Sequence, residues 1–175
     1  MDDFEPGELF KGFDYPRTPV ITKDDPELIQ LYQWGLIPHW AGPDWNRNYT
    51  LNARVETLDQ KRSFSDITGN RCLVILDGFY EWQHVERKKI KYEIGYQGDL
   101  FALGGLYDHN DSGSTYTIVT TEAQGIMREV HNTQLRMPYA LKDRERMDAW
   151  LAGDFPPIDL DFTTRPGLFQ QTQLF

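Results

Sequence analysis

The segment Arg71–Trp82 reads RCLVILDGFYEW and joins an apolar run to a stretch rich in aromatic residues. The run Arg71–Leu76 has the length and composition of a buried strand. Asp77-Gly78 is a typical turn pair, and a second strand is predicted over Tyr80–Gln83. The segment therefore predicts consecutive strands with a short connection, which is the arrangement of an antiparallel sheet.

Glu81 places a carboxylate among the aromatic residues of this second strand. Because side chains alternate between the two faces of a strand, Glu81 shares a face with Phe79, and Tyr80 shares the other with Trp82. Glu is disfavoured in strands, and aromatic surroundings remove water from a carboxylate and raise its pKa. Glu81 is therefore either a solvent-facing residue or a placed acid/base that can both give and take a proton.

Further strands are predicted over Ile29–Trp34, Ile90–Tyr96, Leu100–Tyr107 and Thr115–Thr120. Several strands follow one another without room for crossover helices, so we expect mainly antiparallel pairing. The predicted fold class is α+β, with a strongly bent or barrel-like sheet and peripheral helices.

Capping residues and helix-ending glycines predict short helices outside this sheet. The expected helices are one opened by Thr57 with Gln60 and running through about Ile67, one opened by Thr121 with Gln124, and one from Asp143 to Leu151 ahead of Gly153.

The two ends of the chain show no clear pattern. Residues 1–26 carry several prolines and no sustained period, so an irregular arm is expected there. Trp40–Trp45 is expected to be a loop, and the tail Asp161–Phe175 is either an ordered extension or a flexible end. The chain of 175 residues is expected to form a single domain.

The composition excludes several classes of protein. A single cysteine excludes an internal disulfide and a Cys-rich metal site, and the four His lack partners at ligand spacing, so no metal or other cofactor is expected. There is no long uncharged apolar run, so we expect no membrane span, no signal segment and a cytoplasmic location.

The net charge of -9 argues against nucleic-acid binding by bulk attraction, because that attraction comes from Lys and Arg neutralising phosphates. Any nucleic-acid site must therefore be local. The basic residues gather in two groups, Arg47, Arg54, Lys61, Arg62 and Arg71, and then Arg87, Lys88, Lys89 and Lys91. Such groups are most often solvated surface.

Besides Glu81, the polar side chains of Asn52, His131 and Arg136 are candidates for chemistry. Taken singly, a His at a helix end is often a cap or a surface residue, and an Asn in a turn often serves the backbone. Taken together, a carboxylate, an imidazole and an amide are the set that proton transfer at a polar reaction centre uses.

The order of several short motifs resembles that of a known family. The motifs are Trp34-Gly35-Leu36-Ile37-Pro38, Asn52-Ala53-Arg54 with Glu56-Thr57, Arg71-Cys72-Leu73 before Asp77-Gly78-Phe79-Tyr80-Glu81-Trp82, Ile118-Val119-Thr120-Thr121, and His131 before Arg136-Met137-Pro138. From about Leu31 to Leu151 the chain resembles the SRAP family, the SOS response-associated peptidase fold that senses abasic sites in single-stranded DNA.

The resemblance implies a reaction. In the family, a cysteine directly after the initiator Met captures the aldehyde of a ring-opened abasic sugar through its amine and thiol, which gives a thiazolidine. By position, Asn52 resembles the residue that orients this cysteine, Glu81 the acid/base for ring opening and imine formation, and His131 the assisting histidine.

The resemblance also implies contacts with DNA. Arg54 and Arg136 resemble phosphate-binding arginines, and Trp34, Trp82 and Pro38 are expected to stack or wedge against bases. The implied partner is single-stranded DNA with an abasic site. The protein is expected to act as a monomer and to be associated with the nucleoid when bound to DNA.

The chain departs from the family pattern at its start, Met1-Asp2, where the cysteine is absent. Cys72 is not expected to replace it, because Cys72 lies mid-chain in an apolar run and has no free amine. The alternatives are a member that has lost the covalent step and a sequence that lacks its natural start. We expect the second, with a Met-Cys start in the upstream coding sequence.

A second departure lies between His131 and Arg136, where extra residues interrupt the family's usual His-Asp-Arg-Met-Pro and are expected to reshape the DNA-facing loop. The sequence thus favours an abasic-site crosslinking protein with peptidase-like removal of the residue before the cysteine. The alternatives are a module that binds single-stranded DNA without crosslinking, and a degenerate domain with neither activity.

Overall fold

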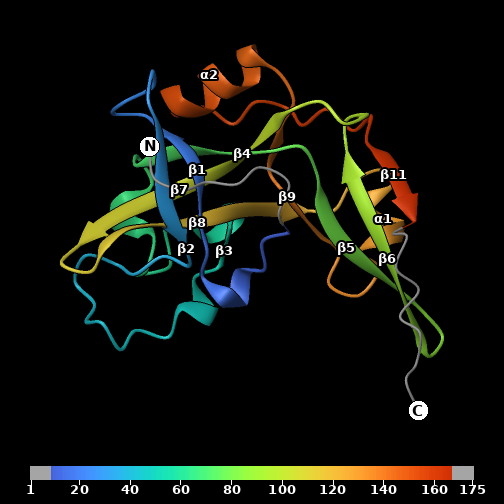
Figure 1. The fold of residues 1–175 in the computed structure, drawn as a ribbon, viewed down its shortest axis with the longest axis horizontal. Coiled ribbons are helices and arrows are strands. Elements are labelled where there is room, and N and C mark those ends of the chain that lie inside the picture. Colours follow the sequence, from blue (N-terminus) through green and yellow to red (C-terminus); the bar gives the residue numbers. More distant parts are fainter. Residues whose placement is uncertain (1–8, 167–175) are drawn as a thin grey trace.

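A computed structural model describes residues 9–166, which form two β-sheets with short helices outside them (Figure 1). The strands are β1 (Arg17–Thr22), β2 (Ile29–Trp34), β3 (Asn52–Arg54), β4 (Arg71–Leu76), β5 (Phe79–Val85), β6 (Lys88–Gly95), β7 (Phe101–Asn110), β8 (Gly113–Glu122), β9 (Arg136–Pro138), β10 (Ala140–Leu141) and β11 (Thr163–Pro166). The helices are α1 (Met127–Val130) and α2 (Arg144–Ala152), with 3-10 turns at η1 (Gly12–Asp14), η2 (Arg47–Tyr49), η3 (Val55–Thr57) and η4 (Ser65–Ile67).

The larger sheet is eight-stranded, in the order β10-β7-β4-β1-β2-β8-β3, with β9 paired to β8. A further pairing between β7 and β8 closes β7, β4, β1, β2 and β8 into a ring. Its pairings are antiparallel except those of β2 and β3 with β8. The predicted α+β class with a mainly antiparallel, barrel-like sheet is confirmed.

The inside of the ring is filled by alternate residues of its strands. Val20 of β1, Tyr32 of β2, Cys72 of β4, Leu103 of β7 and Tyr116 of β8 belong to one buried cluster. Since side chains alternate along a strand, the intervening residues must pack on the outer face.

On that outer face, Leu73, Leu106 and Val119 join a second cluster with Trp150 of α2. Helix α2 lies across this side of the ring, at the top of Figure 1. Both clusters are apolar, and burial of that surface is the main favourable contribution to the free energy of folding.

The smaller sheet has the order β11-β6-β5, and it stands beside the ring with α1 next to it (Figure 1). Phe79 of β5 and Ile94 of β6 contact a third cluster that includes Met127 and Val130 of α1. The strand β5 is an edge strand, and it lies on the side of this sheet nearest the ring. Its free edge is therefore turned toward the space between the two sheets.

The irregular arm expected over residues 1–26 is wrong for residues 17–22, which form β1 at the centre of the larger sheet. The prolines hid the alternation, in which Thr18, Val20 and Thr22 are buried. Pro19 sits opposite Leu31 in the ladder with β2. In the tail, residues 163–166 form β11, and the expectation for residues 167–175 lies outside the described residues.

Two of the helix predictions were wrong. Residues 57–67 form only the turns η3 and η4, and Thr121 lies within β8, with α1 beginning later as a single turn. Thr121 is part of a strand and not a helix cap because it pairs with Met137 of β9. The third prediction is confirmed, since the Asp143 carboxylate accepts from the Arg146 N–H at the start of α2 and Gly153 ends it with a φ of 106°. No helix within residues 9–166 is both long and apolar enough to cross a membrane.

Candidate functional site

Glu81 lies in the middle of β5, with Phe79 and Glu81 half-buried and with Tyr80 and Trp82 exposed. This alternation is the one that the sequence predicts. Burial raises the pKa of the Glu81 carboxyl, while the nearby His131 and a hydrogen bond from the Trp82 backbone N–H act in the opposite direction. The predicted rise in the pKa of Glu81 is thus confirmed, and its cause is loss of water.

His131 follows α1 directly and is half-buried. Its Nδ1 lies 2.5 Å from the backbone carbonyl oxygen of Arg136. A carbonyl oxygen only accepts, so Nδ1 carries a proton and donates it to this oxygen, and Nε2 is the nitrogen that this contact leaves open. The structure therefore brings His131 within electrostatic reach of Glu81 and fixes which of its nitrogens is free.

Arg136 begins β9, and its guanidinium is held by protein groups. Nη1 and Nη2 each donate to one carboxylate oxygen of Glu56 at 2.9 Å, and Nη2 also donates to the Thr120 carbonyl oxygen at 2.8 Å. Hydrogen bonding from Arg136 holds the pKa of the Glu56 carboxyl below its usual range. The arginine expected to bind phosphate is thus already paired with a carboxylate in this structure.

Beside this pair lies an open cavity of about 420 Å³. Its lining residues come from β3, η3, β8 and the segment that leads into β9, and they are Arg54, Glu56, Thr57, Glu122, Gln134, Leu135 and Arg136. Arg54 is exposed at this cavity. Arg54 therefore lies where an anion could reach it, whereas Arg136 first has to exchange Glu56.

The remaining predicted residues differ in how accessible they are. Asn52 is exposed at the start of β3, opposite Ile118 of β8. Trp34 is half-buried and donates to the Leu51 carbonyl at 2.9 Å, and Pro38 is buried. Pro38 is therefore part of the packing that follows β2, and Trp34, the last residue of β2, is only partly accessible.

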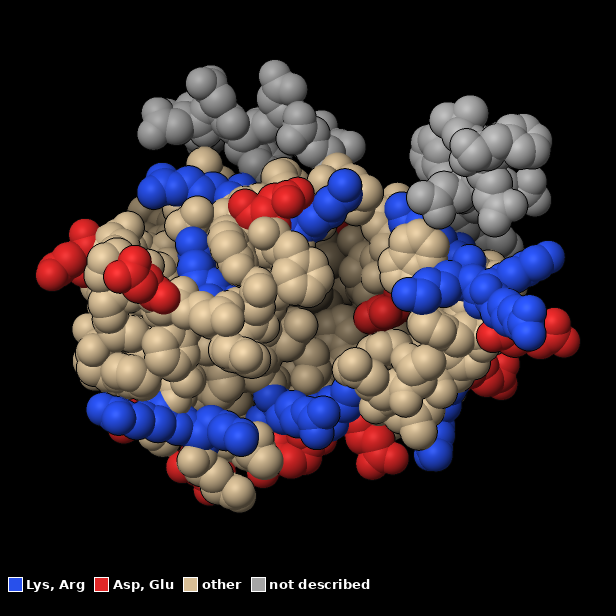
Figure 2. All heavy atoms as spheres, turned by 90° about the horizontal axis from the view of Figure 1, so that it is seen from below, with Lys and Arg blue, Asp and Glu red and all other residues tan. Residues whose placement is uncertain are grey.

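Trp82 belongs to an exposed aromatic and basic strip on the outer face of the β5–β6 hairpin. It lies opposite Lys91, whose Nζ is 3.7 Å from the centre of the Tyr80 ring. Figure 2 shows a cleft between the larger body and this smaller sheet, with an acidic side chain inside it and basic side chains along its borders. On this face of an acidic protein, basic side chains thus lie next to the cleft, where a phosphate could reach them.

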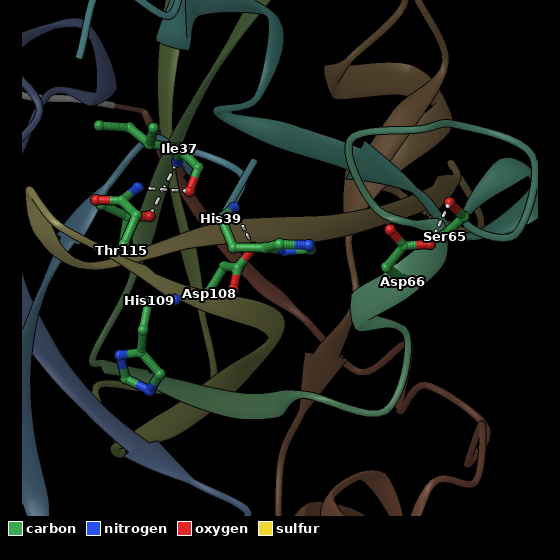
Figure 3. A network of polar contacts seen from close by, with 8 residues as sticks. Ile37, His39, Ser65, Asp66, Asp108, His109 and Thr115 are labelled. Atoms are coloured by element: carbon green, nitrogen blue, oxygen red, sulfur yellow. Dashed lines mark hydrogen bonds and ion pairs between the residues drawn. The ribbon is translucent and has the colours of Figure 1, made fainter. Parts of the chain in front are cut away.

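Two sets of contacts had no signal in the sequence. Asn132 bonds the backbone of β5, and the buried Asp108 accepts from the backbone N–H of His39 at 2.7 Å and from that of His109 at 2.9 Å. The His39 ring also bonds Asp108, as Figure 3 shows. Together with the bond from the Ile37 N–H to Thr115, this network holds the segment that follows β2. Such contacts join residues far apart in the chain, so no local motif reveals them.

No group of three or more His, Cys, Asp or Glu side chains within residues 9–166 is placed to hold a metal ion. The sole cysteine, Cys72, is buried in the ring, and burial raises the pKa of its thiol. Its thiolate is therefore disfavoured, so Cys72 is not a nucleophile.

The family model described as SOS response associated peptidase (SRAP) matches residues 13–166. The chain belongs to the SRAP family. Among curated SRAP relatives, an abasic site processing protein of Saccharomyces cerevisiae is 33% identical over 166 residues, which cover 90% of this chain and 43% of that protein. The abasic site processing protein YoqW of Bacillus subtilis is 38% identical over 140 residues, which cover 75% of this chain and 61% of YoqW.

This SRAP chain thus matches about half of the length of these curated relatives. A crystal structure of a protein from Bacteroides thetaiotaomicron has the same fold, with a TM-score of 0.79, 32% identity, and coverage of 90% of this chain and 76% of that one. The SRAP fold expected from the motifs is therefore confirmed.

Proposed function

We propose that this SRAP chain recognises abasic sites in single-stranded DNA and that Glu81 is the acid/base that acts on the abasic sugar. One observation carries the proposal: the Glu81 carboxyl is half-buried, its pKa is raised by burial, and His131 lies close enough to oppose that rise. A raised pKa brings a carboxyl toward the range in which it can both donate and accept a proton. The names of the curated relatives supply the substrate class.

The proposed chemistry starts from the ring-closed sugar, which Glu81 helps to open to the aldehyde. The amine of an amino-terminal cysteine then adds to the aldehyde carbon, and water leaves with a proton from an acid to give an imine. Addition of the thiol sulfur to the imine carbon closes the thiazolidine. Glu81 serves both proton-transfer steps, and His131 assists by stabilising its carboxylate form.

The covalent step needs an amino-terminal cysteine. We assign lesion recognition and proton transfer to the residues described above, and the crosslink to a form that presents that cysteine. Removal of the residue before the cysteine, the peptidase side of the proposal, belongs to the same form. Asn52, exposed beside β8, would orient the cysteine there.

DNA contact is proposed at the cavity beside β3 and on the hairpin. Arg54 supplies an exposed cation at the cavity, and Trp82 with Lys91 offers an exposed aromatic ring and a charge for a base and a phosphate. In this proposal Trp34 and Pro38 shape the wall behind β2, and Arg136 contacts phosphate only after exchanging Glu56. We propose that the protein binds as a monomer.

The test uses three single-stranded oligonucleotides: one with a natural abasic site, one with a tetrahydrofuran that lacks the aldehyde, and one intact. Fluorescence anisotropy measures binding, and a denaturing gel measures crosslinking. We expect this chain to bind the abasic strand without a gel-stable band. A form extended to begin Met-Cys should give a band with the natural abasic strand alone. Equal affinity for all three strands, with no band from either form, would contradict the proposal.

The second candidate is reversible binding of single-stranded DNA without crosslinking. The exposed rings of Tyr80 and Trp82, with the half-buried Lys91 beside them, favour it, because stacking and charge need no cysteine. It predicts similar affinity for abasic and intact strands and no covalent product from the extended form.

A further inference from the structure

The free edge of β5 is occupied at one point by the side chain of Asn132. Its Nδ2 donates to the His84 carbonyl at 2.8 Å, and the His84 N–H donates to its Oδ1 at 3.0 Å. An edge strand leaves such N–H and C=O groups unpaired, and here one amide side chain takes the place of a neighbouring strand. Only an amide can do this, since it holds a donor and an acceptor side by side.

A second contact fixes the same end of α1 to the same strand. Gln83 of β5 donates from Nε2 to the Glu129 carbonyl at 3.0 Å, and its Oε1 accepts from the Tyr92 hydroxyl at 3.2 Å. The segment Glu129–Asn132 is thus tied to β5 on both sides of His131. Glu81, two residues before Gln83 on the same face of the strand, is carried by the element to which this segment is tied.

His131 lies between these contacts and is held from its other side by the Arg136 carbonyl oxygen. The imidazole therefore has a fixed position relative to β5, and its electrostatic effect on Glu81 depends on that position. Without the Asn132 bonds, the exposed segment that follows His131 loses its tie to β5. His131 is then held by its backbone bonds to Met127 and Leu135 and by the Arg136 carbonyl, none of which fixes it to the strand.

We propose that Asn132 is a positioning residue, which holds the His131 imidazole at a fixed place beside β5, the strand that carries Glu81, by bonding both backbone groups of His84. This inference rests on the proposed function, because it takes the catalytic roles of Glu81 and His131 from there. Asn132 touches neither substrate nor reacting atoms in this scheme, and it acts through the place of His131.

The test compares Asn132→Ala and Asn132→Asp with the matched control Thr133→Ala, an exposed neighbour outside these contacts. Asp keeps the acceptor for the His84 N–H but sets a carboxylate oxygen against the His84 carbonyl, so it should not restore the contact. Circular dichroism and a thermal melt establish that each variant is folded. The main measurement is the titration of the Glu81 carboxyl, followed by carbon NMR in the protein without DNA.

In both Asn132 variants the Glu81 titration should move to higher pH, because His131 no longer opposes the effect of burial. Thr133→Ala should leave the titration at its wild-type position. A Glu81 titration unchanged in folded Asn132→Ala and Asn132→Asp would overturn the inference. If both variants fail to fold, hydrogen exchange of the His84 amide in the wild-type protein tests the inference instead. An amide that exchanges without protection would overturn the inference, because its bond to Asn132 would then not persist in solution.

A second measurement separates the inference from the proposed function. In the form extended to begin Met-Cys, Asn132→Ala should slow crosslinking about tenfold while the affinity for abasic DNA stays within about twofold. A shifted Glu81 titration together with no crosslinking by the wild-type form would leave the positioning role standing and defeat the proposed function. Normal crosslinking kinetics in Asn132→Ala would defeat the positioning role alone.

Discussion

The guanidinium of Arg136 and the carboxylate of Glu56 form a pair of parallel hydrogen bonds, each 2.9 Å long, at the border of the open cavity beside β3. The arginine side chain is largely covered, and 46% of the glutamate side chain is exposed. A DNA phosphate that reaches this point has to compete with Glu56. The pair therefore sets how much Arg136 can add to binding.

Glu56→Gln should strengthen binding of single-stranded DNA about two- to fivefold, because it removes a charge that competes with phosphate for Arg136. The plot of log affinity against log salt concentration should steepen by about 0.7, the value for one additional phosphate contact on a single strand. Fluorescence anisotropy over a salt series measures both quantities. The control is Asp148→Asn, which breaks an exposed ion pair with Arg144 on α2 and should change neither. Weaker binding by Glu56→Gln would show that the pair is needed intact.

Arg54→Ala should weaken binding of single-stranded DNA of every sequence and reduce the slope of the salt dependence by about 0.7, the value for one lost phosphate contact on a single strand. Arg54 is an exposed cation at the cavity, so its loss removes a phosphate contact and no base contact. The same anisotropy series tests this. Arg144→Ala removes a similarly exposed arginine from α2 and serves as the control. An unchanged slope of the salt dependence would mean that no DNA phosphate contacts Arg54.

Glu81→Gln should raise the melting temperature at pH 7. The pKa of Glu81 is higher in the folded protein than its ordinary value, so the folded state binds the extra proton more tightly than the unfolded chain does. The contribution of Glu81 to the free energy of unfolding is therefore fully present below the ordinary glutamate pKa. It is lost as the pH rises through the pKa that Glu81 has in the folded protein. The advantage of the variant should vanish in acid, where Glu81 is protonated in both states.

Thermal melts of wild type and Glu81→Gln at several pH values measure this difference. Glu93→Gln, an exposed glutamate on the adjacent strand β6, is the matched control and should show no such pH dependence. A variant less stable than wild type at pH 7 would contradict the sign. In the form extended to begin Met-Cys, the same substitution should slow crosslinking and leave DNA affinity unchanged.

Gly104→Ala should destabilise the fold by about 1–3 kcal/mol, the usual cost of overfilling a packed core. A Cβ at this position of β7 would lie 2.8 Å from the ring of Trp150, a fully buried residue of α2. Chemical denaturation measures the free energy of unfolding. Gly69→Ala, where nothing lies within 4 Å, is the control and should change it by less than about 0.5 kcal/mol. Equal stability of the two variants would mean that α2 can move away from β7.

Local pattern predicted most of the strands because their signals lie in adjacent residues. The apolar run of β4 and the alternation of β5 identify themselves, and so does the capped helix α2. The predictions were wrong where pairing with a distant strand, and not the local sequence, determines the secondary structure. Thr121 looks like a helix cap, but its backbone completes a ladder with Met137, and β1 looks irregular until its alternate residues meet the inside of the ring.

The sequence by itself determined the SRAP motifs, the α+β class and the aromatic setting of Glu81, because each depends on neighbouring residues and on the alternation of a strand. Only the tertiary structure decided that Glu56 forms an ion pair with Arg136, that Asn132 hydrogen-bonds the edge of β5, and that His131 lies within electrostatic reach of Glu81. These contacts join residues that are far apart in the chain, and their geometry exists only after the two sheets have formed and α1 has packed against β5.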